Sequence, residues 1–139
     1  MSTSELLSQW YDEVWNKSND AFIDEMMSRE VVVYGLDPSG SAKGVENFKV
    51  FYHKFRESFP TVSIKVTPLV SDHQTATAFC NVSARSATGK EVTFSGLCVA
   101  RYFICFKIVE AWNNFDFLKM YQQLGHILVA QIEENTPNS

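Results

Sequence analysis

Apolar side chains recur at helical intervals near the start of the chain. Ser2 and Glu5 have the spacing of a capping box, in which each side chain bonds the backbone N–H of the other residue. The apolar residues that follow are three or four positions apart, as on one face of a helix. They are Leu6, Leu7, Trp10, Tyr11, Val14 and Trp15. The pattern predicts an amphipathic helix that begins next to Ser2.

Two more helices and a first strand are predicted before the alternating part of the chain. Asn19 or Asp20 can cap a second, shorter helix, and the β-branched run 31–34 is typical of a strand. Residues 35–44 contain glycine, proline and serine, which predicts a loop. Aromatic residues between 48 and 59 are spaced as on one helix face, and the proline that follows ends this third helix.

The apolar period then changes to two, which is typical of strands. The expected strands are 62–66, 75–83, 91–105 and 106–115, and a last helix is expected from about 117 to 133. This order predicts an α+β fold in which helices pack on the concave face of a curved, mostly antiparallel sheet. A chain of this length is expected to form a single domain, residues 1–139.

The strand expected at 91–105 is apolar on both faces. One face carries Phe94, Cys98, Ala100, Tyr102 and Ile104, and the other carries Leu97, Val99 and Phe103. Because helices cover only the concave face, the convex face is expected to meet a second subunit in a homodimer. The alternative is a monomer whose core is locally two-sided.

Composition bounds the partners and the kinds of site. The net charge of -4 comes without a basic stripe, which argues against nucleic acid as the main partner. No segment approaches the roughly 18 apolar residues of a membrane helix, and the first residues do not resemble a signal peptide, so we expect a cytoplasmic protein. Cys80, Cys98 and Cys105 lack metal-ligand spacing and are expected to be reduced core residues. We expect the protein to use no metal or organic cofactor.

Asp116 is an isolated carboxylate at the end of a strongly apolar segment. If residues 107–116 form a strand, Asp116 lies on the same face as Ile108, Trp112 and Asn114. A buried carboxylate is costly, so this position needs a partner, solvent or a chemical role. The alternative is that Asp116 caps the following helix, which its place at a strand-to-helix junction favours.

The same region resembles a known family. Lys107-Ile108-Val109-Glu110 is followed by Trp112, Asp116 and Gln123-Leu124-Gly125. With weaker similarities along nearly the whole chain, this pattern is similar to the SnoaL-like polyketide cyclase branch of the nuclear transport factor 2-like superfamily. The resemblance implies a cone-shaped α+β fold with a deep pocket. It also implies a role for Asp116, because in these cyclases the aspartate four residues after the tryptophan is a general acid/base on a polyketide ester.

Two departures from the family pattern bear on this assignment. Cys105-Phe106 stands where the family usually has a polar pair that makes a hairpin turn. The segment before Thr88 also lacks a histidine-containing stretch that many of the cyclases have, so a second catalytic group is missing.

The predicted site combines Asp116 with an apolar pocket for a hydrophobic small molecule. The predicted substrate-binding residues are Tyr34, Phe51, Phe55, Phe94, Arg101, Trp112 and Asn114. The polar ones among them are candidate donors to an enolate that forms when a base removes a proton beside a carbonyl. Two functions stay open: a cofactor-independent cyclase or isomerase, or a non-catalytic module for hydrophobic-ligand binding or dimerisation.

Overall fold

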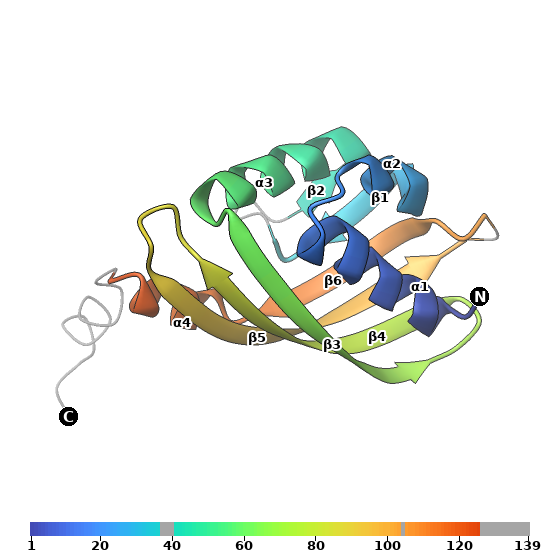
Figure 1. Ribbon diagram of the computed structural model, residues 1–139. Helices are drawn as coiled ribbons and strands as arrows, with labels where there is room; N and C mark the ends of the chain where they lie inside the picture. The colour runs from blue at the N-terminus through green and yellow to red at the C-terminus, as the bar shows by residue number, and fades with distance from the viewer. Residues whose placement is uncertain (37–40, 104, 126–139) are drawn as a thin grey trace, which may run out of the picture.

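The computed structural model describes residues 1–36, 41–103 and 105–125, and these form a curved sheet with helices on one side (Figure 1). The helices are α1 (Thr3–Trp10), the π-helix η1 (Tyr11–Asn16), α2 (Ala21–Met26), α3 (Val45–Ser58) and α4 (Phe117–Gln123). The strands are β1 (Met27–Tyr34), β2 (Ser41–Lys43), β3 (Thr61–Ser71), β4 (Thr75–Arg85), β5 (Glu91–Tyr102) and β6 (Ile108–Phe115).

The sheet has six strands in the order β2-β1-β6-β5-β4-β3. All neighbouring strands are antiparallel except β1 and β6, which run parallel. Figure 1 shows α1, α2 and α3 over the hollow side of the long strands, and α4 beside one end of β5. The predicted α+β cone, with helices on the concave face of a mostly antiparallel sheet, is therefore confirmed.

The first helix starts as its sequence predicts and then changes its winding. The Ser2 hydroxyl accepts a hydrogen bond from the Glu5 backbone N–H at 3.1 Å, which is the expected cap. From Tyr11 the chain continues as a π-helix, and Lys17 donates its N–H to the Asp12 carbonyl five residues earlier. The apolar period alone indicated one uninterrupted helix, because it does not distinguish a turn of this kind from an α-helical one.

Some predicted boundaries are wrong, and so is the predicted burial of Cys105. Residues 41–43, expected in a loop, form β2, which is too short to show a period and exists because it pairs with β1. The strand expected to reach Cys105 ends at Tyr102, and a turn follows in which the Phe103 N–H donates to the Lys107 carbonyl. Cys105 lies in this turn and is exposed, so it is not a core residue.

The last helix is shorter, as far as the structure describes it, than the sequence suggests. Helix α4 ends at Gln123, and Gly125 follows with a φ of 87°, a left-handed conformation that suits glycine at a helix end. The remainder of the helix expected at 117–133, with His126, lies outside the described residues.

A bulge in β6 decides which of its side chains face the helices. Tyr102 of β5 pairs with Ile108, but the adjacent Arg101 pairs with Glu110, so Val109 is an extra residue on β6. An extra residue reverses the alternation of every side chain that follows it. The prediction that Ile108 shares a face with Trp112 is therefore wrong. Ile108 is buried on the concave face, whereas Trp112 is exposed.

The core lies between the concave face and the helices, and strand β5 shows its two sides clearly. Phe94, Cys98, Ala100 and Tyr102 are buried on the concave side, as the alternation predicts. Leu97 and Phe103 are 47% and 63% exposed, and Ile104 lies outside the described residues. Every helix in the described part of the chain is too short or too polar to cross a membrane.

Candidate functional site

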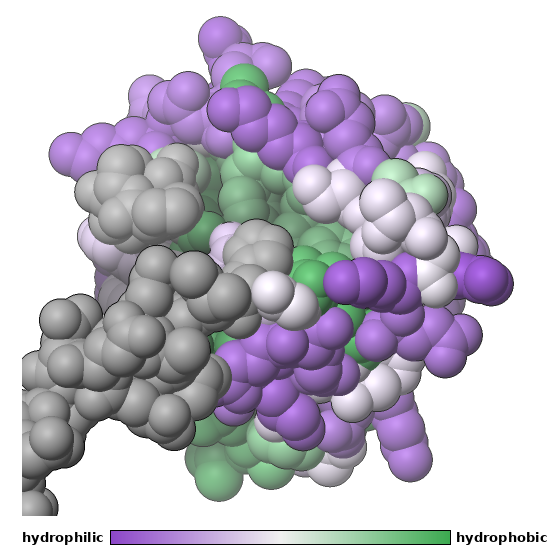
Figure 2. Space-filling model, turned by 90° about the vertical axis from the view of Figure 1, so that its left-hand side faces the viewer, coloured by the Kyte–Doolittle hydropathy of each residue, from purple (hydrophilic) through white to green (hydrophobic). Residues whose placement is uncertain are grey.

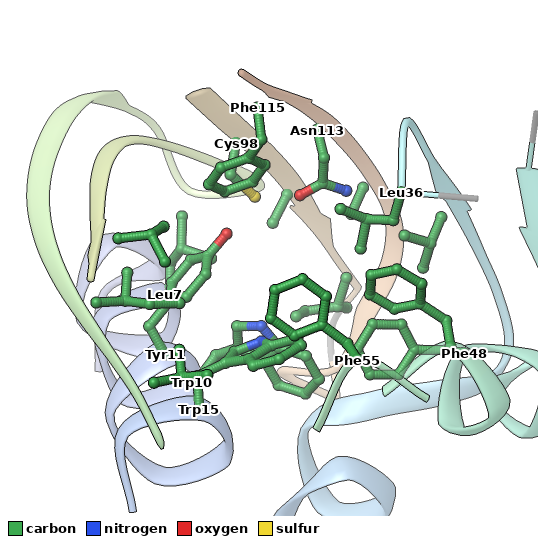
Figure 3. Close-up of a pocket in the computed structure, with 18 of the residues that line it drawn as sticks. Leu7, Trp10, Tyr11, Trp15, Leu36, Phe48, Phe55, Cys98, Asn113 and Phe115 are labelled. Carbon is green, nitrogen blue, oxygen red and sulfur yellow. The ribbon is translucent and has the colours of Figure 1, made fainter. Parts of the chain in front are cut away.

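An apolar cavity lies between the helices and the concave face of the sheet (Figure 3). Its volume is about 60 Å³. The helical wall includes Trp10, Tyr11, Trp15 and Phe48, and the sheet contributes Cys98, Asn113 and Phe115. No aspartate, glutamate, lysine, arginine or histidine of the described chain lines this cavity. Such a cavity selects a ligand mainly by shape and apolar contact.

A wider outer groove adjoins this cavity. It has a volume of about 970 Å³ and is bordered by residues of α3 and α4. Leu36, Phe51, Phe55 and Phe117 line both spaces, so the two are continuous. Figure 2 shows the recess as a hydrophobic hollow inside a hydrophilic rim. Lys54 is the one charged side chain that the described residues contribute to the groove lining.

Asn113 places an amide in the cavity wall. Its Nδ2 donates to the Tyr34 carbonyl at 3.0 Å, and this fixes the amide orientation, since a carbonyl can only accept. Its Oδ1 accepts no hydrogen bond within the described residues. Figure 3 shows the Asn113 amide pointing into the cavity beside Leu36 and Phe115. The sequence analysis missed this residue because only the bulge turns it inward.

Tyr11 and Cys98 line the same wall, and with the buried Cys80, which is not a lining residue, they form a neutral polar group. Desolvation, together with the Cys98 and Cys80 thiols, raises the pKa of the Tyr11 hydroxyl well above its usual value. Desolvation likewise raises the pKa of Cys80 to about 11 and that of Cys98 to about 12. All three groups are protonated at neutral pH, and a protonated thiol is a poor nucleophile. This part of the wall therefore offers neither charge nor an activated sulfur.

The predicted substrate-binding residues fall into two separate groups. Phe51, Phe55 and Phe94 line the cavity. The other four, Tyr34, Arg101, Trp112 and Asn114, are not among the cavity-lining residues. The bulge places Trp112 and Asn114 on the convex face, so their predicted position in the pocket is wrong.

Three of these residues form a cluster on the convex face. The Tyr34 and Trp112 rings stack with centroids 5.7 Å apart, and the Arg101 guanidinium lies 5.6 Å from the centre of the Trp112 ring. Arg101 also pairs with Glu110, whose other carboxylate oxygen lies 3.4 Å from the Tyr34 hydroxyl. These side chains are satisfied by one another and do not approach the cavity.

Asp116 has the geometry of a helix cap. Its carboxylate accepts a hydrogen bond from the Lys119 backbone N–H at 3.0 Å, and the side chain is exposed at the start of α4. It is not a lining residue, but its neighbours Phe115 and Phe117 both are. The backbone of Asp116 thus belongs to the cavity rim, while the carboxylate lies outside the lining.

Potential metal ligands are scattered in the described structure. No three histidine, cysteine, aspartate or glutamate side chains of the described residues come close enough to hold a metal ion. His53 is exposed on α3, where its ring packs edge-on against Tyr52, and His73 is exposed in the turn before β4.

Comparison with known proteins places this cavity in a family. The family described as SnoaL-like polyketide cyclase matches residues 5–124. The chain belongs to this family. No curated protein matches it by sequence. The fold and the family expected from the sequence pattern are therefore confirmed.

Solved structures with the same fold include proteins of different description. IdmH from Streptomyces antibioticus, a proposed polyketide cyclase, has a TM-score of 0.77 at 19% identity, covering 91% of this chain and 100% of its own. A proposed polyketide cyclase from Acidithiobacillus ferrooxidans has a TM-score of 0.75 at 24% identity, covering 89% of this chain and 95% of its own. AclR from Streptomyces galilaeus, a proposed hydroxylase, has a TM-score of 0.72 at 18% identity, covering 89% and 98%. Because identity is low, these similarities establish the fold and not the reaction.

Proposed function

We propose that this protein binds a neutral, hydrophobic small molecule of the polyketide type in the apolar cavity and the adjoining groove. The main support for this proposal is that no charged side chain of the described residues lines the inner cavity. An ionic group would lose its hydration there without finding a counter-charge, which is costly. The inner cavity, at about 60 Å³, is smaller than the engineered cavity of about 150 Å³ that holds benzene. The ligand therefore places one end inside and its bulk in the outer groove, and it needs no metal or organic cofactor to be held.

The test is the binding of naphthalene, a neutral bicyclic aromatic. Tryptophan fluorescence or calorimetry measures the binding. Phe51 is half-buried at the junction of the cavity and the groove, so Phe51→Glu puts a charge on the entry path without burying it in the core. We expect this variant to bind naphthalene at least about tenfold more weakly, from lost apolar contact and the cost of desolvating the charge. Leu118→Glu is the matched control, because Leu118 is exposed on α4 and lines neither space. Equal weakening by both variants, or none by either, contradicts binding in this cavity.

A cofactor-independent ester cyclase or isomerase reaction is a second candidate function. The observation that favours it is the position of Asp116 between two cavity-lining residues. The resemblance of this region to the cyclases of the family also implies a general acid/base role for the aspartate at this place. To act as general acid/base on a bound carbonyl compound, Asp116 has to leave its bond to Lys119 and turn toward the groove. The capping geometry favours binding over catalysis as the function that this arrangement supports best. A cytoplasmic location remains a prediction from the sequence.

A further inference from the structure

Two tryptophans on the helical wall of the cavity have unused hydrogen-bond donors. Trp10 and Trp15 are only 5% and 7% exposed, and both line the inner cavity. Neither indole N–H donates to any group within residues 1–36, 41–103 and 105–125. Figure 3 shows both indole nitrogens toward the middle of the cavity, on the side opposite Cys98 and Phe115. Tyr102 Oη is the one fully buried side-chain polar atom of the described residues without a partner, so the two indole nitrogens still reach the cavity space. The two N–H groups are therefore open to an acceptor that enters the cavity.

The apolar spacing predicts that Trp10 and Trp15 share a helix face, and the π-helix affects how closely their side chains align. In an α-helix a turn takes 3.6 residues, so side chains five positions apart point in different directions. In a π-helix, hydrogen bonds join residues five apart, so such residues lie more nearly on the same side of the helix than in an α-helix. Trp10 is the residue from which η1 starts, and Trp15 is five positions later. Short π-helical segments are rare in proteins overall, and many of those that occur lie at functional sites.

The rest of the cavity wall defines what kind of acceptor fits. The described lining holds no cation that would compensate an anion, and the Tyr11 hydroxyl and Cys98 thiol are both neutral, because burial raises the pKa of each. A carbonyl oxygen is an acceptor that carries no charge. The small inner volume also suits the end of a planar molecule better than a whole ring system.

We propose that the indole N–H groups of Trp10 and Trp15 bind a carbonyl oxygen of the hydrophobic ligand. The inference rests on the proposed function and narrows it to aromatic or conjugated ketones, quinones and related carbonyl compounds. Donors fixed around a carbonyl oxygen also stabilise negative charge that develops on it, so the same pair would favour an enolate over the free ketone.

The experiment uses two probes that differ in one atom group. 2-Acetylnaphthalene carries a ketone, and 2-isopropenylnaphthalene has the same planar shape with a methylene group in place of the oxygen. A neutral hydrogen bond is worth about 1 kcal/mol net, so two donors should favour the ketone by about tenfold or more. In the double variant with Trp10→Phe and Trp15→Phe, which keeps aromatic rings and removes both N–H groups, we expect this preference to disappear. Thermal unfolding of the variant checks that it is folded.

Nuclear magnetic resonance of the unmodified protein gives a second readout that does not depend on a variant. The chain has three tryptophans, so a ¹⁵N-labelled sample has three indole N–H signals. The ketone should move the signals of Trp10 and Trp15 downfield, and the alkene should not. Trp112 lies on the convex face and serves as an internal control whose signal stays in place.

The outcomes separate the inference from the function on which it rests. If neither probe binds, the proposed function fails and the inference fails with it. If both probes bind with equal affinity and the two indole signals respond alike to each, the cavity binds hydrophobic molecules but the indole groups do not recognise a carbonyl. That result would leave ordered water as their acceptor. A ketone preference that persists in the double variant likewise overturns the assignment.

Discussion

Asp116 links the fold and the candidate chemistry at the scale of one residue. Asparagine can accept the same hydrogen bond from the Lys119 N–H, so Asp116→Asn should change the free energy of unfolding by less than about 1 kcal/mol. Asp116→Ala removes the cap and should cost about 1 kcal/mol. Urea unfolding of the three proteins measures both values.

The same pair of variants tests the catalytic role. Asparagine cannot take up a proton, so a turnover assay on a carbonyl substrate should show a loss of about a hundredfold or more in Asp116→Asn if Asp116 is the base. Turnover that survives this change would mean that another residue does the chemistry. A protein without turnover whose asparagine variant binds naphthalene normally fits the binding function.

The buried thiols predict how stability depends on pH. The pKa values of Cys80 and Cys98 are raised to about 11 and about 12 in the folded protein, whereas an unfolded thiol ionises near its ordinary pKa of about 8.5. Above that pH the folded state binds more protons than the unfolded state, so the free energy of unfolding falls as pH rises. The contribution is fully present at neutral pH and is lost progressively from about pH 8.5 toward the folded pKa values. Urea unfolding between pH 7 and 10 should show this decline.

Cys98→Ala supplies the control for the pH dependence. This variant removes one of the two raised thiols, so its stability should fall less steeply over the same range, although its stability at pH 7 is lower because a buried side chain is truncated. An identical slope in both proteins would show that the thiols do not govern alkaline unfolding.

At the scale of elements, the π-helix is anchored to an edge strand by one side chain. The Asn16 amide donates to the Ile64 carbonyl at 2.9 Å, and its oxygen accepts from the Ile64 N–H at 2.6 Å. Strand β3 is the last strand of the sheet order, so this amide occupies backbone groups that no further strand bonds. We expect Asn16→Ala to lower the free energy of unfolding by about 1 to 3 kcal/mol and to weaken naphthalene binding, because Trp15 is adjacent in the same helix.

Asn19→Ala is the matched control for this element. Its amide makes only a long contact of 3.4 Å to Glu13, so its removal should change stability by less than about 0.5 kcal/mol. Urea unfolding and the naphthalene titration measure both variants. If Asn16→Ala behaves like this control, the bonds to Ile64 do not hold η1 in place.

At the scale of the whole molecule, the convex face is the place where a second copy is expected. Leu97, Phe103 and Trp112 are 47%, 63% and 39% exposed. Leu97 pairs with Phe79 on β4 and with Asn114 on β6, so it lies inside the sheet face and not at an edge. We propose a homodimer joined through this face, with an interface of about 1,200 to 2,000 Å² in total.

A charge introduced into the apolar convex face tests the dimer. Leu97→Glu should yield monomers in light scattering coupled to size exclusion, because an unpaired carboxylate at the centre of an interface is costly. Leu118→Glu, on exposed α4, should keep the dimer. If the unmodified protein is a monomer, the proposed dimer is wrong. The convex face would then be exposed to solvent in the monomer.

Much of the fold could be predicted from the sequence because it depends on local periods. The strict alternation of β5 separates buried Phe94 and Cys98 from exposed Leu97 without knowledge of the partners of that strand. The spacing of Ser2 and Glu5 likewise predicted a cap that the structure confirms, since a capping box is formed within one helical turn. A helix cap is also local, so the sequence predicted capping by Asp116 as one of two interpretations of this residue.

The cavity depends on two departures from those periods, and only the tertiary structure decided them. Val109 is an extra residue that lets β6 pair with β5 on one side and β1 on the other, and it turns Asn113 inward and Trp112 outward. The π-helix changes the winding between Trp10 and Trp15, which the apolar period had already placed on one face. Neither departure has a local signal, because Val109 and the residues of η1 also suit a regular strand and a regular helix. Periodicity therefore determined which elements form, whereas pairing and packing between distant segments determined which side chains meet in the cavity.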